Sequence, residues 1–371
     1  MSNIFKMLLG GDAPPVTDGA LMIWGNGGSG QLGDGTTVDK SSPVQVGSLT
    51  TWVSVAGGEI HTMAIKTDGT LWAWGGNANG QLGDSTTVSK SSPVQVGALT
   101  TWSTTGVGHV FTLATKTDGT LWAIGGMNTS GQLGLGITTN QSSPTQIGAL
   151  TTWLSVAAGQ GHSMAVRTDG TLWTWGLNNS GSLGHGTSGA AGSKSSPTQV
   201  GALTTWLEIS GGNNNSASVK TDGTLWLWGR NNYGQLGDGT TVDKSSPVQV
   251  GALTTWAKVA LGSYHCLGLK TDGTLWAWGF NIHGQLGDGT TVNKSSPIQV
   301  GALTTWSDIS AGTSYNAQSG AIKTDGTIWL WGRNNKGQLG DGTTVNKSSP
   351  IQVGALTTWL NVECSYETSG A

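Results

Sequence analysis

Residues 52–75 decide the fold and read Trp52-Val-Ser-Val-Ala-Gly-Gly-Glu-Ile-His61-Thr-Met-Ala-Ile-Lys66-Thr-Asp-Gly-Thr-Leu71-Trp-Ala-Trp-Gly75. They contain three short β-prone runs, at residues 52–55, 62–66 and 70–74. Asp68-Gly69 lies between the second and third runs, and such a pair predicts a tight hairpin with positive φ at both central residues. A fourth run, residues 43–46, begins at a proline, as an edge strand can. Together the runs predict a four-stranded antiparallel meander as the unit of the fold.

The unit recurs along the whole chain. The glycine that ends the Leu-Trp-x-Trp run returns at intervals of 50, 50, 51, 53, 50 and 53 residues. Its seven positions are Gly25, Gly75, Gly125, Gly176, Gly229, Gly279 and Gly332. Runs such as 63–65 and 71–74 are apolar at successive positions, so both faces of each sheet must be covered. Seven four-stranded units of about 50 residues, without any helical period, predict an all-β fold, a seven-bladed β-propeller.

The two ends of the chain predict how the ring closes. The last copy supplies an innermost strand and part of the next one after Trp359, and the first copy lacks that portion. We therefore expect the N- and C-terminal strands to share one blade, which removes the open edges of an incomplete ring. The expected organisation is an N-terminal extension at residues 1–15 and one propeller domain at residues 16–371.

The composition excludes several classes of protein. The 371 residues carry a formal charge of −3, which gives no electrostatic reason to expect a nucleic-acid partner. Two cysteines cannot form a disulfide framework. The longest apolar run near the N-terminus, Met7-Leu8-Leu9, is too short for a signal-peptide core or a membrane span. We therefore expect no membrane insertion and no export by a recognised signal.

Several stretches resemble the repeat of the regulator of chromosome condensation family. They are Val55-Ala-Gly-Gly-Glu-Ile-His61-Thr62, Asp68-Gly-Thr-Leu-Trp-Ala-Trp-Gly75 and Asn77-Ala-Asn-Gly80-Gln81-Leu82-Gly83. The likeness covers about residues 16–371, and it implies a seven-bladed propeller, as the repeat spacing does. The chain is identified as a member of bacterial or bacteriophage type.

The known functions of that family transfer less readily than its fold. Nucleotide exchange on a small GTPase would need a protruding wedge loop and chromatin docking a basic surface, but the longest insertions here have three residues. The plant ultraviolet-B receptor uses Gly-Trp-Arg-His-Thr motifs, whereas the equivalent stretch here, Gly58-Glu59-Ile60-His61-Thr62, has no tryptophan. The secreted β-lactamase-inhibiting propeller is the nearest functional model, although it requires an export signal. The resemblance thus implies a ring used as a binding surface.

Differences between the seven copies indicate where binding would occur. In a meander, alternate connections lie on opposite faces, and the face with Thr-Asp-Gly and Gly-Ala-Leu-Thr-Thr-Trp is nearly constant between copies. The other face holds every histidine, every tyrosine and every length change. Such loops on a rigid scaffold usually carry binding residues, with aromatic and Arg side chains as anchors. We expect this variable face to bind a protein or a surface glycan through Arg230, Tyr233, Tyr264, Phe280, His283, Tyr315, Arg333 and Lys336. The alternative is drift among tolerant loops.

Two repeated or motif-like features have structural interpretations. His61, His162 and His265 take the same position in three units, but no carboxylate or thiol follows at ligand spacing, so we expect structural hydrogen bonds. Gly25-Asn-Gly27-Gly-Ser-Gly30 matches a dinucleotide fingerprint, but the following Gln31-Leu-Gly-Asp-Gly cannot open the helix that this fingerprint needs.

Acidic and thiol side chains give no catalytic pattern either. One aspartate per unit, for example Asp34, is expected to cap a turn rather than to bind calcium. Cys266 and Cys364 lie at different positions of their units, so we expect free thiols. No nucleophile–base pair or carboxylate pair stands out. We expect no catalytic residues, no metal, no cofactor and no enzyme activity.

The sequence favours a non-enzymatic recognition or structural module. Low charge, abundant Gly, Ser, Thr and Asn, and near-identical units suggest a bacteriophage virion or tail-associated protein that is assembled in the host cytoplasm. We expect residues 1–12 to dock the ring onto a larger virion assembly through Ile4, Phe5, Met7, Leu8 and Leu9, or else to pad the closing blade. The alternative is a soluble cytoplasmic regulator or inhibitor of the same family that binds a protein.

Overall fold

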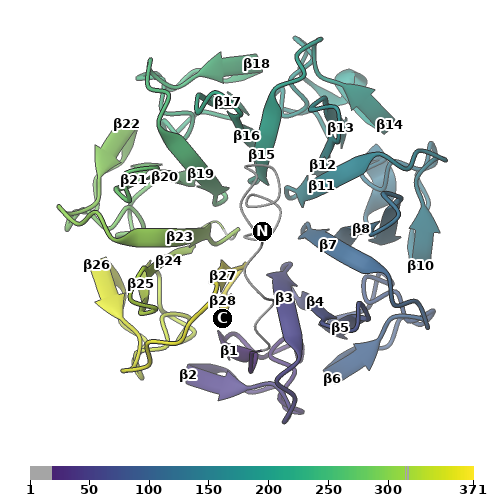
Figure 1. Ribbon diagram of the computed structural model, residues 1–371, viewed down its shortest axis with the longest axis horizontal. Coiled ribbons are helices and arrows are strands. Elements are labelled where there is room, and N and C mark those ends of the chain that lie inside the picture. Colours follow the sequence, from purple (N-terminus) through teal and green to yellow (C-terminus); the bar gives the residue numbers. More distant parts are fainter. Residues whose placement is uncertain (1–18, 314, 316) are drawn as a thin grey trace.

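The computed structural model describes residues 19–313, 315 and 317–371, which form a ring of seven four-stranded antiparallel sheets (Figure 1). Each sheet is one blade. In six blades the strands follow chain order from the centre of the ring outward, as the predicted meander requires. The seven-bladed propeller expected from the repeat spacing is therefore confirmed.

The strand bounds repeat almost identically from blade to blade. Blades 1 to 3 comprise β3 (Trp52–Gly57), β4 (His61–Lys66), β5 (Leu71–Gly75), β6 (Lys90–Gln95); β7 (Trp102–Val107), β8 (Phe111–Lys116), β9 (Leu121–Gly125), β10 (Gln141–Gln146); and β11 (Trp153–Ala158), β12 (His162–Arg167), β13 (Leu172–Gly176), β14 (Lys194–Gln199). Blades 4 to 6 comprise β15 (Trp206–Gly211), β16 (Asn215–Lys220), β17 (Leu225–Gly229), β18 (Lys244–Gln249); β19 (Trp256–Leu261), β20 (His265–Lys270), β21 (Leu275–Gly279), β22 (Lys294–Gln299); and β23 (Trp306–Ala311), β24 (Gln318–Lys323), β25 (Ile328–Gly332), β26 (Lys347–Gln352). Two single-turn 3-10 helices, η1 (Asn128–Ser130) and η2 (Ala190–Gly192), lie in loops of blades 2 and 3.

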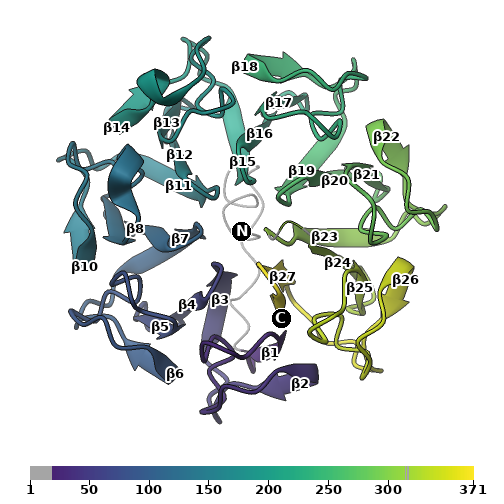
Figure 2. The same cartoon turned by 180° about the vertical axis from the view of Figure 1, so that it is seen from behind.

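The seventh blade joins the two ends of the chain. Its strands are β27 (Glu363–Cys364), β28 (Thr368–Gly370), β1 (Met22–Gly25) and β2 (Lys40–Gln45), in that order from the centre outward. β1 pairs with β28 through Trp24 opposite Ser369, and the N–H of Met22 donates to the carbonyl of Ala371 at 2.9 Å. The view from behind shows the same closure (Figure 2). The expectation that the terminal strands share one blade is therefore confirmed.

The Thr-Asp-Gly hairpin differs from the predicted turn. Among Thr67, Asp68 and Gly69, only the glycine has a positive φ, 74°. Its N–H donates to the carbonyl of Lys66 at 2.9 Å, which defines a type I turn closed by a left-handed glycine. The Oδ1 atom of Asp68 accepts the N–H of Thr70 at 3.0 Å. This bond holds the aspartate without the left-handed conformation that the expected turn would have required.

The outermost strands begin earlier than predicted. β2 starts at Lys40, so Pro43 lies inside the strand instead of at its first residue. The pairing of β1 with β2 shifts register between Ile23 and Gly25. A proline has no N–H to donate and is tolerated on an edge strand or beside such an irregularity. The prediction of an edge strand was right, and its start was wrong by three residues.

A hydrogen bond from a buried tryptophan joins each blade to the one before it. The indole N–H of Trp74 in β5 donates to the carbonyl of Gln31 at 2.9 Å, and Gln31 lies in the β1–β2 loop of the preceding blade. The hydroxyl of Thr62 donates to the same carbonyl at 2.9 Å. Five further tryptophans make the equivalent bond: Trp24, Trp175, Trp228, Trp278 and Trp331. Blade 2 has Ile124 at this position instead.

The bond requires a glycine two residues after the accepting carbonyl. At Gly237, φ is +70°, and a Cβ atom would lie 2.7 Å from Nε1 of Trp278. At Gly251, φ is similar at +61°, but a Cβ atom would have no neighbour within 4 Å. The two glycines thus differ in the space around them and not in backbone conformation.

We predict that G237A destabilises the protein more than G251A does. Both variants strain a left-handed residue, at a cost of about 1–2 kcal/mol. G237A also forces its methyl group against the indole ring, which adds about 1–3 kcal/mol. Urea unfolding of both variants measures the difference, and equal loss would show that the glycine–tryptophan contact contributes nothing.

Candidate partner-binding face

The face that varies between copies is formed by two loops of every blade. Antiparallel order puts the loop between the first and second strands and the loop between the third and fourth at the same end of a blade. In blade 4 these loops are residues 212–214 and 230–243. We call the surface built from them the variable face, and the opposite surface the constant face.

Four aromatic side chains from three neighbouring blades form one cluster on the variable face. The aromatic cluster consists of Tyr233 in blade 4, Tyr264 and Phe280 in blade 5, and Tyr315 in blade 6. The ring centroids of Tyr233 and Phe280 are 4.6 Å apart, and those of Tyr264 and Tyr315 are 4.9 Å apart. The hydroxyl oxygens of Tyr233 and Tyr315 lie 2.9 Å from each other. Side chains 82 residues apart in sequence therefore meet because their blades are neighbours.

The cluster has a buried floor and an exposed top. Tyr264 and Phe280 are buried, whereas Tyr315 is 49% exposed and the nearby Ile282 is 50% exposed. Tyr315 is carried by the loop between β23 and β24, where blade 6 has its three extra residues. An exposed apolar surface on a fixed aromatic floor loses little side-chain entropy on binding, as anchor sites do.

A cation lies against the cluster. The guanidinium carbon of Arg230 is 5.1 Å from the ring centroid of Tyr264, and its Nη1 donates to the hydroxyl of Tyr264 at 3.3 Å. The side-chain amide of Asn213 donates to the same hydroxyl at 3.2 Å. Within residues 19–313, 315 and 317–371, no carboxylate forms an ion pair with this arginine. The site can therefore offer both apolar contact and an unneutralised positive charge.

The hydrogen bond between the two phenols affects the titration of Tyr233. It raises the pKa of Tyr233, and burial adds to the rise. The phenol of Tyr233 thus stays protonated across the physiological range and adds no negative charge to the site near Arg230.

Three other residues expected to bind a partner make contacts with residues outside the cluster. Nη1 of Arg333 is 3.4 Å from a carboxylate oxygen of Glu367, and Nζ of Lys336 is 3.1 Å from Asp39. Nδ1 of His283 is 3.2 Å from the side-chain amide of Asn346. These three residues lie in loops of the variable face, but two of their charges are already paired within it.

The sequence did not reveal two members of the site. Asn213 and Ile282 lie in the variable loops beside predicted residues, yet single polar or aliphatic residues in loops carry no signal of their own. The predicted docking residues Ile4, Phe5, Met7, Leu8 and Leu9 lie outside the described residues.

The buried histidines join blades to one another, as the sequence suggested. Nε2 of His162 is 2.8 Å from the hydroxyl of Ser216 in the next blade, and Nε2 of His265 is 2.9 Å from that of Ser319. His61 makes a longer contact, 3.2 Å, with Thr112. Burial lowers the pKa of His162 and of His265 to about 4 and that of His61 to about 3. The rings are therefore neutral in the folded protein at pH 7.

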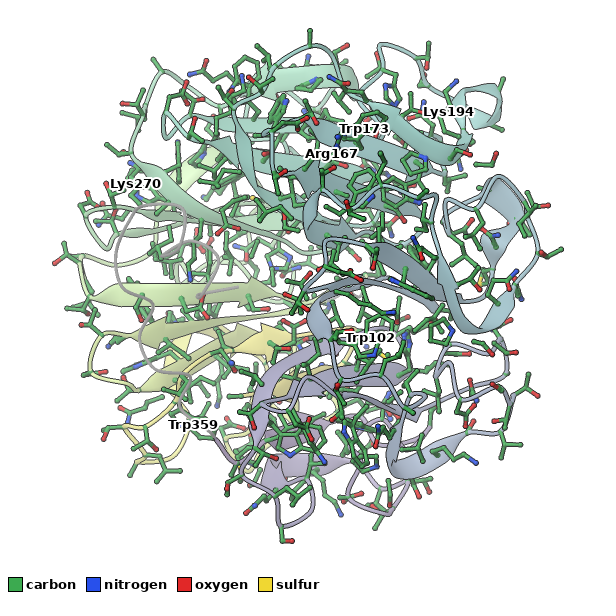
Figure 3. All side chains as sticks on the ribbon, turned by 45° about the vertical axis from the view of Figure 1, so that its right-hand side comes forward. Trp102, Arg167, Trp173, Lys194, Lys270 and Trp359 are labelled. Atoms are coloured by element: carbon green, nitrogen blue, oxygen red, sulfur yellow. The ribbon has the colours of Figure 1, made fainter. Side chains whose placement is uncertain are left out.

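The constant face is conserved between blades because its residues pack against one another. In blade 1, Nζ of the buried Lys66 lies 3.5 Å from the ring centroid of Trp72 and 4.8 Å from that of Trp52. Four more blades repeat this contact with Lys116, Lys220, Lys270 and Lys323. In blade 3 the cation is Arg167, 5.7 Å from Trp173 (Figure 3). The repeated cation–π contact stabilises each blade and explains the constancy of this face without a ligand.

The described part of the chain has neither a membrane-spanning helix nor a cluster of metal-binding side chains. No helix there is long and apolar enough to cross a membrane. The same residues contain no group of three or more His, Cys, Asp or Glu side chains placed to hold a metal ion. Cys266 and Cys364 are free, as expected.

Family models match most of the chain. Residues 154–371 match the model of the RCC1-like domain. Residues 18–65, 68–115 and 118–166 match the regulator of chromosome condensation (RCC1) repeat.

Curated relatives match shorter segments. The chain is similar to an X-linked retinitis pigmentosa GTPase regulator homolog of Caenorhabditis elegans, with 39% identity over 23% of this chain and 6% of the relative. It is 36% identical to the ultraviolet-B receptor UVR8 of Arabidopsis thaliana over 30% of this chain and 26% of the receptor. It is 32% identical to the mouse (Mus musculus) regulator of chromosome condensation over 29% of this chain and 26% of the relative. The matches thus span about a quarter or less of each relative.

Solved structures share the fold over nearly the whole chain. Human WBSCR16 superposes with a TM-score of 0.85 and 22% identity, over 95% of this chain and 98% of that one. Yeast RCC1 (Prp20), in a structure bound to Kap60, superposes with a TM-score of 0.82 and 19% identity, over 96% and 88% of the two chains. At these identities the likeness establishes the architecture alone.

The buried histidines predict a pH dependence of stability. Their pKa values are lower in the folded chain than the ordinary value of 6.5, so between pH 6.5 and about 4 the unfolded chain binds more protons. Each such histidine therefore costs about 1.4 kcal/mol per pH unit as the pH falls through this window. We predict that H162N, which copies Asn215 of blade 4, reduces the slope of unfolding free energy against pH by about one proton.

Urea unfolding of wild type and H162N at pH 4.5, 5.5, 6.5 and 8 provides the measurement. At pH 8 both imidazole and amide are neutral, so the difference there reports the lost hydrogen bond alone. Parallel curves over the whole range would show that His162 titrates normally in the folded protein.

Proposed function

We propose that this chain, which belongs to the family of RCC1-like domains, is a protein-binding regulator whose partner binds the variable face at the aromatic cluster. The observation that supports this proposal is the meeting of Tyr233, Tyr264, Phe280 and Tyr315 over blades 4 to 6. The blades otherwise repeat one another closely, and no other part of the described loops gathers aromatic rings in this number.

The chemistry of the site favours a particular kind of protein segment. Tyr315 and Ile282 offer exposed apolar area, and Arg230 offers a cation without an ion-pair partner in the described residues. An apolar or aromatic side chain placed beside a carboxylate would satisfy both. We therefore propose a partner segment with an acidic residue next to a large apolar residue, in preference to the surface glycan that the sequence left open.

The regulator is preferred over the virion component suggested by the sequence. The curated relatives come from animals and a plant, and two of the three carry the word regulator in their names. Yeast Prp20p has been studied for its binding to Gsp1p and histones, which supports protein binding as a use of this fold. We place the protein in the cytoplasm, and its two free thiols are compatible with a reducing compartment. We propose no enzymatic step.

A matched pair of variants tests the proposed surface. Ile282 and Leu253 are 50% and 48% exposed, the first in the loop that carries Phe280 and the second on the constant face. Partners retained by the immobilised chain from its native lysate are identified, and the dissociation constant of the purified partner is measured. We predict that I282S and Y315A each weaken binding at least tenfold, whereas L253S changes it less than twofold, with thermal stability unchanged in all three.

Arg230 provides a second readout of the same site. R230Q should weaken binding and make the remaining affinity less sensitive to salt, because a charge pair at the rim is lost. A partner that binds all variants equally would contradict the proposed surface. Recovery of the native chain only in particles of megadalton mass would instead favour the virion component.

A further inference from the structure

The innermost strands of the seven blades surround a central channel. The cavity along the axis has a volume of about 870 Å³ and is lined mainly by β3, β7, β11, β15, β19, β23 and β27. Each of the six complete strands has six residues, so the channel wall is about 20 Å long. This volume lies in the range of small-molecule sites, about 300–1,000 Å³.

The wall is neutral on one side and charged on the other. Two residues after the first tryptophan of each blade, blades 1 to 3 carry Ser54, Thr104 and Ser155. At the same position blades 4 to 6 carry Glu208, Lys258 and Asp308. The closing blade has Asn361 there and adds Glu363 two residues further along. The charged residues come from four neighbouring blades and leave the channel with three carboxyl groups and one ammonium group on one side.

The single cation neutralises only one carboxylate. Nζ of Lys258 is 2.7 Å from Oδ1 of Asp308. Burial opposes the charge of Lys258, but the ion pair outweighs it and raises the pKa of the lysine. Its charge acts mainly on Asp308 and more weakly on Glu208, and neither Glu208 nor Glu363 has a cation within ion-pair distance in the described chain.

Glu208 is buried and Glu363 is half-buried, and neither has an adequate partner in the described structure. Glu208 is 8% exposed, and its carboxyl group has no hydrogen bond or ion pair among residues 19–313, 315 and 317–371. Glu363 accepts one long hydrogen bond, 3.5 Å, from the N–H of Gly57. Burial raises the pKa of Glu208 although the charge of Lys258 opposes the rise, and burial raises the pKa of Glu363 to about 8 against the opposing hydrogen bond from Gly57. The negative charge of Asp308 adds to both shifts. Burying an acid without a partner lowers the stability of the fold unless another group compensates for its lost hydration.

Unused hydrogen-bonding groups face the same cavity from the neutral side. Ser54 and Ser155 are among the residues that line the channel, and their buried hydroxyls have no hydrogen-bond partner in the described structure. Apolar side chains such as Val55 and Val259 lie between these polar groups along the wall. The channel thus combines two spare carboxyl groups, spare hydroxyls and apolar stretches along a narrow axis.

We propose that the central channel binds a linear aliphatic diamine or polyamine, with its ammonium groups at Glu208 and Glu363 and its methylene chain along the apolar wall. Two ammonium groups balance the two unpaired acids. A hard metal cation fits less well, because Ca²⁺ takes six to eight oxygen ligands and Lys258 stands between the acids. Other charged groups near the cavity are Lys66 and Asp68, at the constant-face end of blade 1.

Calorimetric titration of the full chain with cadaverine and with spermidine tests the proposal. The neutral 1,5-pentanediol has the same chain length as cadaverine and serves as control ligand. We expect saturable one-to-one binding of both amines and no binding of the diol. Raising the salt concentration from 50 to 300 mM should weaken amine binding at least tenfold. In two buffers of different ionisation enthalpy, binding at pH 7 should release a proton, because an ammonium beside Glu363 favours its ionised form.

Variants in the channel separate a ligand site from a structural charge cluster. E208Q and E363Q keep the size of the side chain and should each weaken amine binding at least tenfold. E59Q removes the same charge from a loop of the variable face and should change binding less than twofold. K258M removes the competing cation and should strengthen amine binding about tenfold. A purely structural role for these residues would not produce an increase in affinity.

Clear outcomes would overturn the proposal. They are the absence of saturable heat with either amine, equal binding of the diol, or equal losses in E208Q and E59Q. Thermal unfolding will show whether K258M folds. If it does not, E208Q and E363Q decide alone, because replacing a buried acid by an amide is expected to keep or raise the stability of the protein. These results are independent of partner binding at the aromatic cluster.

Discussion

The bond from a buried indole to the preceding blade is the interaction on which the ring depends. Nε1 of Trp74 and the hydroxyl of Thr62 both donate to the carbonyl of Gln31, so one backbone oxygen accepts two bonds from the next blade. A glycine follows at Gly33, where any Cβ atom would collide with the indole. The Trp-Gly and Gly-Gln-Leu-Gly motifs are thus two halves of one interblade contact, and this explains why they recur together.

A scaffold held in this way leaves its two faces under different constraints. On the constant face, Lys66 and its equivalents are packed between tryptophans, so these positions are fixed by stability. On the variable face the loops keep repeated hydrogen bonds such as that from Asn231 to Asp238, and blades 4 to 6 have acquired Tyr233, Phe280 and Tyr315 at other loop positions without disturbing the strands beneath. The charged side of the channel lies over the same blades, through Glu208, Lys258 and Asp308. The aromatic cluster and the channel charges are therefore concentrated in one part of the ring.

The sequence predicted the architecture because the spacing of the repeats shows how the chain is divided into blades. Seven glycines at nearly equal spacing define the number of blades, and the incomplete first and last copies define the closure. The turn at Asp68-Gly69 was predicted with the wrong geometry, since a pair preference does not distinguish a two-residue turn from a type I turn followed by a left-handed glycine.

The site was predicted less completely than the fold. The variable loops and their aromatic residues follow from comparison of the copies, but the sequence does not say that Tyr233 and Tyr315 touch while Arg333 and Lys336 pair elsewhere. That depends on the reach of individual side chains across blades. The channel charges were missed because Glu208, Lys258 and Asp308 lie within strands. The sequence alone does not distinguish a strand position that faces the channel from one that faces the outer solvent.

Hydrogen–deuterium exchange of the ring with and without its purified partner tests the central claim most directly, namely that the partner binds the variable face over blades 4 to 6. Slower exchange on binding is predicted in residues 212–214, 230–233, 262–264 and 280–283. No change is predicted in residues 250–255 and 300–305 on the constant face. Protection confined to the constant face, or spread equally over all seven blades, would contradict the account.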